Sequence, residues 1–469
     1  MSLFSSNITK QNVNQLKLTF QVNTHSYVTG EPLFYNGKIY AADWQGYIYC
    51  IDAISGEVIY EKQLYQPPKQ VAWIRRIPLI NTYFGEPLPY MWNGFAGTGC
   101  ISNSIWYLAS VGGKEGGLLT NGAPGRLYAV DTSDGSILWE TQIGQSEYSG
   151  SLAVPVCDND NIYVALCSCE EIVSVVRKLL FKPFSPQCTG EVLAYDKYTG
   201  KKLWNRKTVG LNSSDNLNTK GAGIWGGLEL NSSDKILYTT TGNSYGQPVS
   251  KSSDAIIAIH SHNGNPLWTF QAVAKDAWMP LKKDGPDFDF GCTPILFNCL
   301  SSPSGYAVGA GNKNGYFYTL NSESGKLIWK TFCHINSTPD DGIRSNATYV
   351  KGKIYIWSKN KKPKDTMSVC CLNAEDGKLI WNKITNGTNS MTTGAITNGL
   401  YFLGNYSGEL FSLDTESGES LWKAKLSNGS IGSNIAIYRN HIYGGIGVPA
   451  LYGGNPNICG IFCYGVSSS

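Results

Sequence analysis

Two aspartates separated by a single residue, Asp287 and Asp289 in the segment GPDFDFG, are candidates for chemistry in this 469-residue chain. On an extended segment, side chains two positions apart point the same way, so the two carboxylates could share one cation. Hard cations prefer oxygen ligands, and a bound cation acts as a Lewis acid on a carbonyl oxygen. A nearby metal would also keep such an aspartate ionised at neutral pH, as a general base requires.

Other reactive residue types show no comparable pattern. The five histidines lack zinc-ligand spacing, and His260 and His262 fall within a repeated turn. The glycine run VGGKEGG lacks the Gly-Lys-Ser/Thr ending of a phosphate-binding loop and indicates a hairpin loop. No Cys-x-x-Cys-His motif for covalent haem attachment is present. The sequence therefore disfavours a zinc hydrolase and a nucleotide-binding protein.

Composition favours a folded, all-β chain. Hydrophobic residues make up 42% and charged residues 16%, with 52 glycines, 28 tyrosines and a net charge of +3. So small a net charge gives no argument for nucleic acid or an anionic membrane as partner. No apolar run reaches the roughly 18–20 residues of a membrane span, and no signal peptide is visible at the N-terminus. We expect a soluble protein and leave its compartment and oligomeric state open.

One repeat organises the chain: an apolar strand, a turn ending in Gly, and an aromatic residue four positions later. The seven Gly–aromatic pairs are Gly56–Tyr60, Gly135–Trp139, Gly200–Trp204, Gly264–Trp268, Gly325–Trp329, Gly377–Trp381 and Gly418–Trp422. Each Gly is expected at a position with positive φ in a hairpin loop, and each aromatic ring is expected to wedge between adjacent sheets. With the pair of short strands before each copy, every unit has about four strands, as in a propeller blade.

Strands of an eighth unit are predicted at the C-terminus in HIYGG and GIFCYGV, and its missing last strand in QLKLTFQV, with Phe20 in place of the Trp. The prediction is a single eight-bladed β-propeller domain over residues 1–469, closed by the N-terminal strand, which removes two free sheet edges. Seven blades with a loose tail is the alternative.

The repeated turn resembles the tryptophan-docking motif of quinoprotein dehydrogenases, which bind pyrroloquinoline quinone (PQQ) at the propeller axis. Residues 222–291 resemble the polyvinyl-alcohol-dehydrogenase branch of that family in the motifs they contain and in the order of those motifs. The resemblance implies a metal, Ca²⁺ or a lanthanide, that bridges quinone and protein. It also implies a carboxylate that removes the alcohol proton while hydride moves to the quinone. Cofactor-free scaffold propellers share the repeat, so the repeat alone does not specify activity.

The resemblance implies two metal ligands outside the aspartate pair. Glu170, after the strand NIYVALCSC, takes the place of a metal-binding Glu, and Asn243, in TTTGNSYG, takes the place of an amide ligand. Alternatively, Glu170 and its neighbour Glu171 are solvated charges at a strand end. Asn243 could likewise be an ordinary turn residue after Gly242.

By the same resemblance, Asp287 takes the role of the general base and Asp289 that of the additional carboxylate in lanthanide-type members, and both could be metal ligands. The sequence departs from the family here. In the alcohol dehydrogenases the base directly follows a Trp, whereas Trp278 is followed by Met279. The alignment of Asp287 with the base could therefore be off by two residues.

Three residues are assigned to the cofactor by resemblance: Trp225 in GIWGG as the floor on which the quinone stacks, Lys313 in GAGNKNGYFY near the quinone oxygens, and Gly242. A cation at Lys313 would stabilise the reduced, anionic cofactor. An ordinary core Trp and an exposed turn Lys are the alternatives.

Two insertions, residues 66–95 and 170–188, could form a lid or a partner surface, the second as a short amphipathic helix. The family's vicinal disulfide has no counterpart in an early blade, because the adjacent pair Cys370-Cys371 lies in a late strand.

The resemblance implies an oxidoreductase that oxidises a primary or secondary alcohol or a polyol with PQQ and a bound metal. Because the chain has no motif for covalent haem, its electrons would pass to an external acceptor. Relatives of this kind are usually periplasmic or secreted. The alternative is a cofactor-free propeller that acts as a structural or interaction scaffold.

Overall fold

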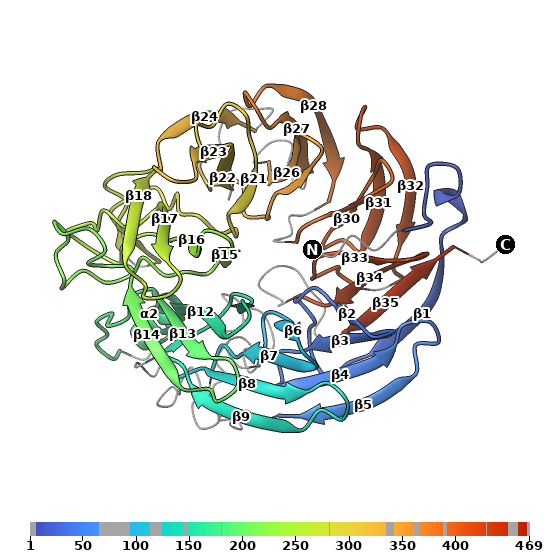
Figure 1. Ribbon diagram of the computed structural model, residues 1–469, viewed down its shortest axis with the longest axis horizontal. Coiled ribbons are helices and arrows are strands. Elements are labelled where there is room, and N and C mark those ends of the chain that lie inside the picture. The colour runs from blue at the N-terminus through green and yellow to red at the C-terminus, as the bar shows by residue number, and fades with distance from the viewer. Residues whose placement is uncertain are drawn as a thin grey trace.

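The computed structural model describes residues 6–64, 94–112, 124–144, 146, 148–179, 181–280, 282–333, 342–360, 366–387, 392–427, 429–448 and 458–466. Eight antiparallel sheets stand around a central axis like the blades of a propeller (Figure 1). The predicted all-β, eight-bladed architecture is confirmed, and the seven-bladed alternative is wrong.

Strands follow the chain from the axis outward in each of the first seven blades. Blade 1 contains β2 (Leu33–Tyr35), β3 (Lys38–Ala42), β4 (Tyr47–Asp52) and β5 (Val58–Gln63). Blade 2 contains β6 (Cys100–Ser102), β7 (Ile105–Ala109), β8 (Arg126–Asp131) and β9 (Ile137–Gln142). In blade 3, β10 (Ser149–Gly150) and β11 (Val156–Cys157) both pair with β12 (Asn161–Ser168), followed by β13 (Glu191–Asp196) and β14 (Lys202–Lys207). Blade 4 contains β15 (Leu228–Asn231), β16 (Ile236–Thr240), β17 (Ala255–His260) and β18 (Pro266–Gln271).

The remaining blades repeat this order. Blade 5 contains β21 (Ile295–Asn298), β22 (Tyr306–Gly311), β23 (Tyr316–Asn321) and β24 (Leu327–Phe332). Blade 6 contains β25 (Thr348–Val350), β26 (Lys353–Lys359), β27 (Thr366–Asn373) and β28 (Leu379–Asn386), and blade 7 contains β29 (Ala395–Thr397), β30 (Leu400–Gly404), β31 (Glu409–Asp414) and β32 (Ser420–Lys425). A two-stranded ribbon, β19 (Trp278–Met279) with β20 (Lys282–Lys283), lies in the connection between blades 4 and 5.

The ring closes as predicted. Blade 8 joins β33 (Ala436–Tyr438), β34 (His441–Ile446) and β35 (Gly460–Gly465) with β1 (Lys17–Asn23) from the N-terminal region. Lys17 pairs with Gly465 and Asn23 with Gly460 in an antiparallel ladder whose register shifts once, between Leu18 and Phe20. Residues before β1 include η1 (Val13–Gln15) and reach blade 7, where Lys10 forms an ion pair with Asp414 at 2.5 Å.

The repeated Gly and aromatic residues join neighbouring blades. All seven turn glycines have φ between 67° and 76°, a region that favours glycine. A Cβ atom on Gly200 would lie 2.6 Å from the Trp139 ring of the preceding blade. Phe20 fills this role across the closure, because a Cβ on Gly56 would lie 2.5 Å from its ring. The aromatic wedge between adjacent sheets is therefore observed, with Phe20 in the predicted place.

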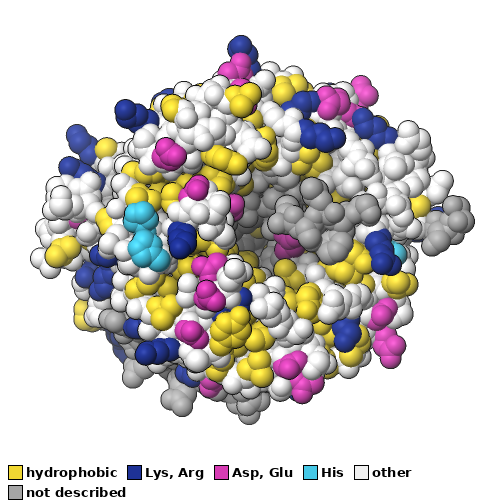
Figure 2. Space-filling view, in the orientation of Figure 1, with side chains coloured by type: hydrophobic (Ala, Val, Ile, Leu, Met, Phe, Trp, Pro, Cys, Tyr) yellow, Lys and Arg dark blue, Asp and Glu magenta, His cyan; other side chains and the backbone are white. Residues whose placement is uncertain are grey.

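The middle strands of each blade form the core. In β3 and β4 nearly every residue is buried, whereas the outer strand β5 is mostly exposed. Figure 2 shows one face of the ring, hollowed near its centre, with acidic and basic side chains interspersed around the rim. That mixture agrees with the small net charge of the chain.

Strand direction decides which loops share a face. In each sheet the second strand ends, and the fourth strand leads into the next blade, on the face opposite the Gly turns. The insertion at 170–188 lies on this face and contains the predicted helix, α2 (Glu170–Leu179). The insertion at 66–95 lies almost entirely outside the described residues. In the described ranges, no helix is both long enough and apolar enough to cross a membrane.

Candidate active site

Loops from blades 3, 4 and 5 meet on that face. Glu170 and Glu171 follow β12, Asn243 follows β16, and Lys313 lies in the turn between β22 and β23. Asp287 and Asp289 lie in the connection that leads into β21.

Lys313 lies between the two aspartates. Its Nζ atom is 3.0 Å from Asp287 Oδ1 and 2.6 Å from Asp289 Oδ1. The indole Nε1 of Trp225 donates to Asp289 Oδ2 at 3.0 Å, and Lys313 Nζ lies 5.3 Å from the centre of the indole ring. Four of the predicted residues thus form one connected cluster, in which Lys313 contacts the other three.

The backbone around Asp287 is held by a residue that the sequence did not single out. Asp287 has a φ of 63°, which is strained for a residue other than glycine. The buried carboxylate of Asp276 accepts the backbone N–H groups of Asp287 at 3.2 Å and of Phe288 at 2.7 Å. Asn312 Nδ2 donates to the Phe288 carbonyl at 2.6 Å. Asp276 and Asn312 are therefore positioning residues for the pair of aspartates.

Burial separates the roles of the two aspartates. The side chain of Asp287 is 27% exposed, whereas that of Asp289 is 6% exposed. Burial, followed by the charge of Asp289, raises the pKa of Asp287 to about 7, although Lys313 opposes this. Burial disfavours the ammonium of Lys313, but Asp289 and Asp287 outweigh it and raise the pKa of Lys313. Lys313 is accordingly charged at neutral pH, and Asp287 can exchange a proton there.

The two glutamates point to different surroundings. The carboxylate of Glu170 is buried and accepts the backbone N–H groups of Gln187 at 2.7 Å and Cys188 at 2.9 Å. Glu170 thereby ties the start of α2 to the chain that returns from the insertion. Burial raises the pKa of Glu171 to about 8, and the charges of Lys313 and the aspartate pair also act on it. Of the two neighbours, Glu171 is the one electrically coupled to the site.

Gly242 and Asn243 back the site from blade 4. A Cβ atom on Gly242 would lie 2.9 Å from Asp289 Oδ2 and 3.2 Å from Trp225 Nε1, so glycine leaves room for that hydrogen bond. The amide Nδ2 of Asn243 donates to the carbonyl oxygens of Trp278 at 2.7 Å and Ser244 at 3.1 Å. These bonds direct the amide nitrogen of Asn243 toward the backbone. The Oδ1 atom of Asn243 is then the side-chain atom that could coordinate a metal.

Asp254 is a further acidic residue that sequence reasoning missed. It is fully buried, and neither carboxylate oxygen has a hydrogen-bond partner among the described residues. Burial, followed by the charges of Asp289 and Asp276, raises its pKa well above the ordinary value. Its only sequence signal was an aspartate immediately before the apolar strand β17, and that signal alone does not indicate a functional residue.

The described residues do not form a ready metal site. No group of three or more Asp, Glu, His or Cys side chains within them is arranged to hold a metal ion. Lys313 fills the space between the two proposed carboxylate ligands, and Glu170 is committed to backbone N–H groups. The quinone assignment fits better, because Trp225 offers a partly buried ring with a cation beside it.

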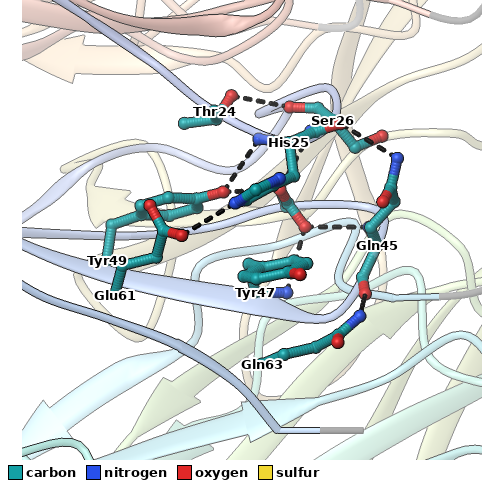
Figure 3. Close-up of polar contacts among 9 residues, drawn as sticks. Thr24, His25, Ser26, Gln45, Tyr47, Tyr49, Glu61 and Gln63 are labelled. Atoms are coloured by element: carbon teal, nitrogen blue, oxygen red, sulfur yellow. Dashed lines mark hydrogen bonds and ion pairs between the residues drawn. The ribbon is translucent and has the colours of Figure 1, made fainter. Parts of the chain in front are cut away.

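A second buried polar cluster, in blade 1, provides a reference for this site. Asp43, fully buried after β3, accepts four hydrogen bonds. The donors are the backbone N–H groups of Ser26, Gln45 and Tyr47 and the hydroxyl of Tyr49. Figure 3 shows His25 stacked on Tyr47 and directed at Glu61, 2.7 Å from its Oε1. Burial raises the pKa of Asp43 to about 6 although these hydrogen bonds oppose the change.

Comparison with known families agrees with the resemblance seen in the sequence. Residues 165–334, which contain the candidate site, match the family model described as "Glucose/ethanol/alcohol dehydrogenase, beta-propeller domain". Residues 253–445 match the model of the outer membrane protein assembly factor BamB.

Curated relatives include two polyvinylalcohol dehydrogenases. The one from Sphingopyxis sp. (strain 113P3) is 26% identical over 384 residues, which cover 70% of this chain and 57% of the relative. The one from Pseudomonas sp. is 23% identical over 452 residues, covering 89% and 64% respectively. The chain thus spans less than two thirds of the length of these relatives.

Solved structures share the fold. A europium-containing methanol dehydrogenase superposes with a TM-score of 0.73 at 15% identity, covering 98% of this chain and 95% of that one. BamB from Moraxella catarrhalis gives a TM-score of 0.60 at 13% identity, with 96% and 99% covered. The resemblance of this chain to the quinoprotein dehydrogenase propellers is therefore confirmed.

Proposed function

We propose that the chain is an alcohol oxidoreductase whose reaction takes place beside Asp287, Lys313 and Trp225. The observation that carries the proposal is the Asp287–Lys313–Asp289 arrangement on Trp225. It lies within the residues that match the dehydrogenase propeller model.

Oxidation of an alcohol removes the hydroxyl proton to a base and the C–H hydrogen, with its electron pair, to an acceptor. Asp287 is the proposed base, because its carboxylate is partly exposed and its pKa of about 7 suits proton exchange at neutral pH. Asp289 is the proposed positioning residue, because it is almost buried and bonded to both Trp225 and Lys313. Bound PQQ would supply the hydride acceptor. An external electron acceptor would then reoxidise the cofactor, and the proposal does not specify which molecule this is.

The remaining predicted residues have supporting roles in the proposal. Gly242 and Trp225 form the wall against which a flat cofactor would lie, and Lys313 supplies positive charge beside it. Glu171 replaces Glu170 as the candidate carboxylate at the site, and Asn243 Oδ1 is the proposed amide ligand of a bound metal. Helix α2 carries Glu171, so the insertion at 170–188 is proposed to border the substrate entrance.

The substrate class follows from the relatives and is a proposal for this chain. Two relatives bear the name polyvinylalcohol dehydrogenase, and a third is a glycerol dehydrogenase large subunit from Gluconobacter oxydans. We therefore propose a secondary or primary alcohol, including polyols, as substrate.

A scaffold without cofactor is the second candidate. The match of residues 253–445 to BamB favours it, as does the ion pairing that already satisfies Lys313. In this case Asp287, Asp289 and Lys313 would stabilise the seam between blades 4 and 5.

A titration separates the two candidates. Purified, metal-stripped chain would be titrated with PQQ alone, with PQQ plus Ca²⁺, and with PQQ plus La³⁺, while quinone absorbance and thermal midpoint are recorded. The oxidoreductase proposal expects saturable binding in at least one arm, followed by alcohol-dependent reduction of an artificial acceptor. Binding in none of the three arms would favour the scaffold, and binding only with a metal would show that Lys313 moves aside.

A further inference from the structure

A pair of cysteines bridges two neighbouring blades away from the candidate active site. Cys100 begins β6 in blade 2, Cys157 ends β11 in blade 3, and their sulfur atoms lie 3.7 Å apart. Both residues are half-buried, whereas Cys370 and Cys371 are fully buried. A disulfide requires sulfur atoms about 2.05 Å apart, so the two atoms need to approach by only about 1.6 Å.

A buried ammonium lies beside this pair. Lys197 is 1% exposed, and its Nζ donates to Ser102 Oγ at 3.1 Å and to the carbonyl oxygen of Asp158 at 2.8 Å. These acceptors lie two residues after Cys100 and one residue after Cys157, respectively. The charge of Lys197 therefore acts on both thiols, and at Cys157 the carboxylate of Asp158 opposes it.

The surroundings make the two thiols unequal. The hydrogen bond from Cys100, followed by the charge of Lys197 and a hydrogen bond from Ser102, lowers the pKa of Cys157 to about 7 against the effect of burial. The pKa of Cys100 is raised, because its thiol donates to Cys157 and because partial removal from water disfavours its thiolate. Since the thiolate is the nucleophilic form, Cys157 is placed as the attacking sulfur and Cys100 as the resolving one.

We propose that Cys100 and Cys157 form a reversible thiol-oxidation site that links blades 2 and 3. With a low-molecular-weight disulfide as oxidant, the Cys157 thiolate attacks one of its sulfurs and forms a mixed disulfide, releasing one thiolate that takes up a proton. The Cys100 thiol then gives up its proton and attacks the Cys157 sulfur, releasing the second small thiol. Two protein thiols are oxidised to one disulfide, and the small disulfide is reduced to two thiols.

The test uses the full chain, first reduced and then incubated with oxidised glutathione at neutral pH. Peptide mapping without reduction is expected to recover a Cys100–Cys157 cross-linked peptide, and the thermal midpoint is expected to rise and to fall again with dithiothreitol. The variant Cys100→Ser is expected to stop at the mixed disulfide, with glutathione on Cys157. Cys157→Ser is expected to yield neither product at this pair, and Cys371→Ser, a buried control, is expected to behave as the wild type.

Two results would overturn the proposal. One is a wild-type chain in which Cys100 and Cys157 stay unlinked after oxidation, and the other is a Cys100→Ser protein that carries no glutathione on Cys157. If the variants fold poorly, the rate of iodoacetamide alkylation of Cys157 in the wild type provides an independent check. Its midpoint is expected near pH 7, and a midpoint at or above the ordinary thiol value of about 8.5 would exclude Cys157 as the nucleophile.

Discussion

The same turn occurs between the second and third strands of blades 1 and 5, but it holds different side chains. In blade 1, Asp43 opens the turn and bonds the backbone N–H groups of Gln45 and Tyr47. In blade 5, Asn312 opens it and bonds the N–H group of Asn314. The second position is Trp44 in blade 1 and Lys313 in blade 5, and only the lysine meets a pair of aspartates. The repeat thus fixes the backbone of the turn, and the side chain at its second position decides whether the turn belongs to a candidate site.

Of the changes in these two turns, replacing Lys313 is expected to have the largest effect on stability and activity. Lys313→Met leaves Asp287 and Asp289 facing each other without a cation, and loss of one partner of a buried pair costs about 3–5 kcal/mol. Proton uptake by Asp287 would reduce that figure. Chemical denaturation should show the loss, and any PQQ-dependent turnover should fall by about 100-fold or more. The exposed Lys326→Met is the control, and equal stability of the two variants would contradict the bridging role.

Asp287→Asn is expected to separate chemistry from stability. If Asp287 is the base, turnover should fall by about 100-fold or more, while the free energy of unfolding changes by less than about 1 kcal/mol because the side chain is partly exposed. Steady-state kinetics with an artificial acceptor and urea unfolding provide the two measurements, with the exposed Asp376→Asn as control. Full turnover in Asp287→Asn would remove the residue from the mechanism.

For Asp43 in blade 1 we expect the opposite of Asp287: replacing it should change stability rather than turnover, because the residue is structural. Asp43→Ala should cost about 2–3 kcal/mol, since it leaves buried N–H and O–H donors without an acceptor. Asp43→Asn should cost less, because blades 5 and 7 carry Asn312 and Asn405 at this position. Urea unfolding of both variants tests this, and an Asn variant as unstable as the Ala variant would show that the negative charge itself is needed.

The smallest expected effect concerns pH. Burial raises the pKa of Asp43 to about 6 from an ordinary value of 3.8, so the folded chain binds this proton more tightly than the unfolded chain. The stabilisation of the folded chain by this tighter proton binding is complete below pH 3.8 and is lost as pH rises through about 6. Between about pH 5 and about pH 7 the free energy of unfolding should therefore fall by about 1 kcal/mol from this group. The pH dependence of urea unfolding should be shallower in Asp43→Asn, and an unchanged slope would contradict the assignment.

Much of the fold was predictable because each blade repeats one local pattern. The turn glycines, the docked aromatic rings and the closure by Phe20 depend on residues close in sequence or on an identical neighbour in the next blade. The aspartate pair and Trp225 could also be located, because each stands in a short local motif, GPDFDFG and GIWGG respectively.

The details of the site could not be predicted, because they depend on loops from three blades meeting in space. Nothing local distinguishes Glu170 from Glu171; the returning chain at Gln187 decides which carboxylate is bound to backbone. Asp276 accepts the backbone N–H of Asp287, which has a positive φ, and neither the contact nor the backbone angle follows from the local sequence. Sequence reasoning placed Lys313 beside a cofactor, whereas in the structure it bridges two carboxylates.

The closure of blade 8 also sets how the ring responds to mechanical force. Lys17 and Gly465 are paired at one end of the β1–β35 ladder, so tethers attached there would pull from the same end of two antiparallel strands. Such a load breaks the hydrogen bonds of the ladder one after another, which is the unzipping geometry. It does not load all of these hydrogen bonds at once, as shear would. We expect the ring to yield first at this seam under tension, at a low force, while the other seven blades remain folded.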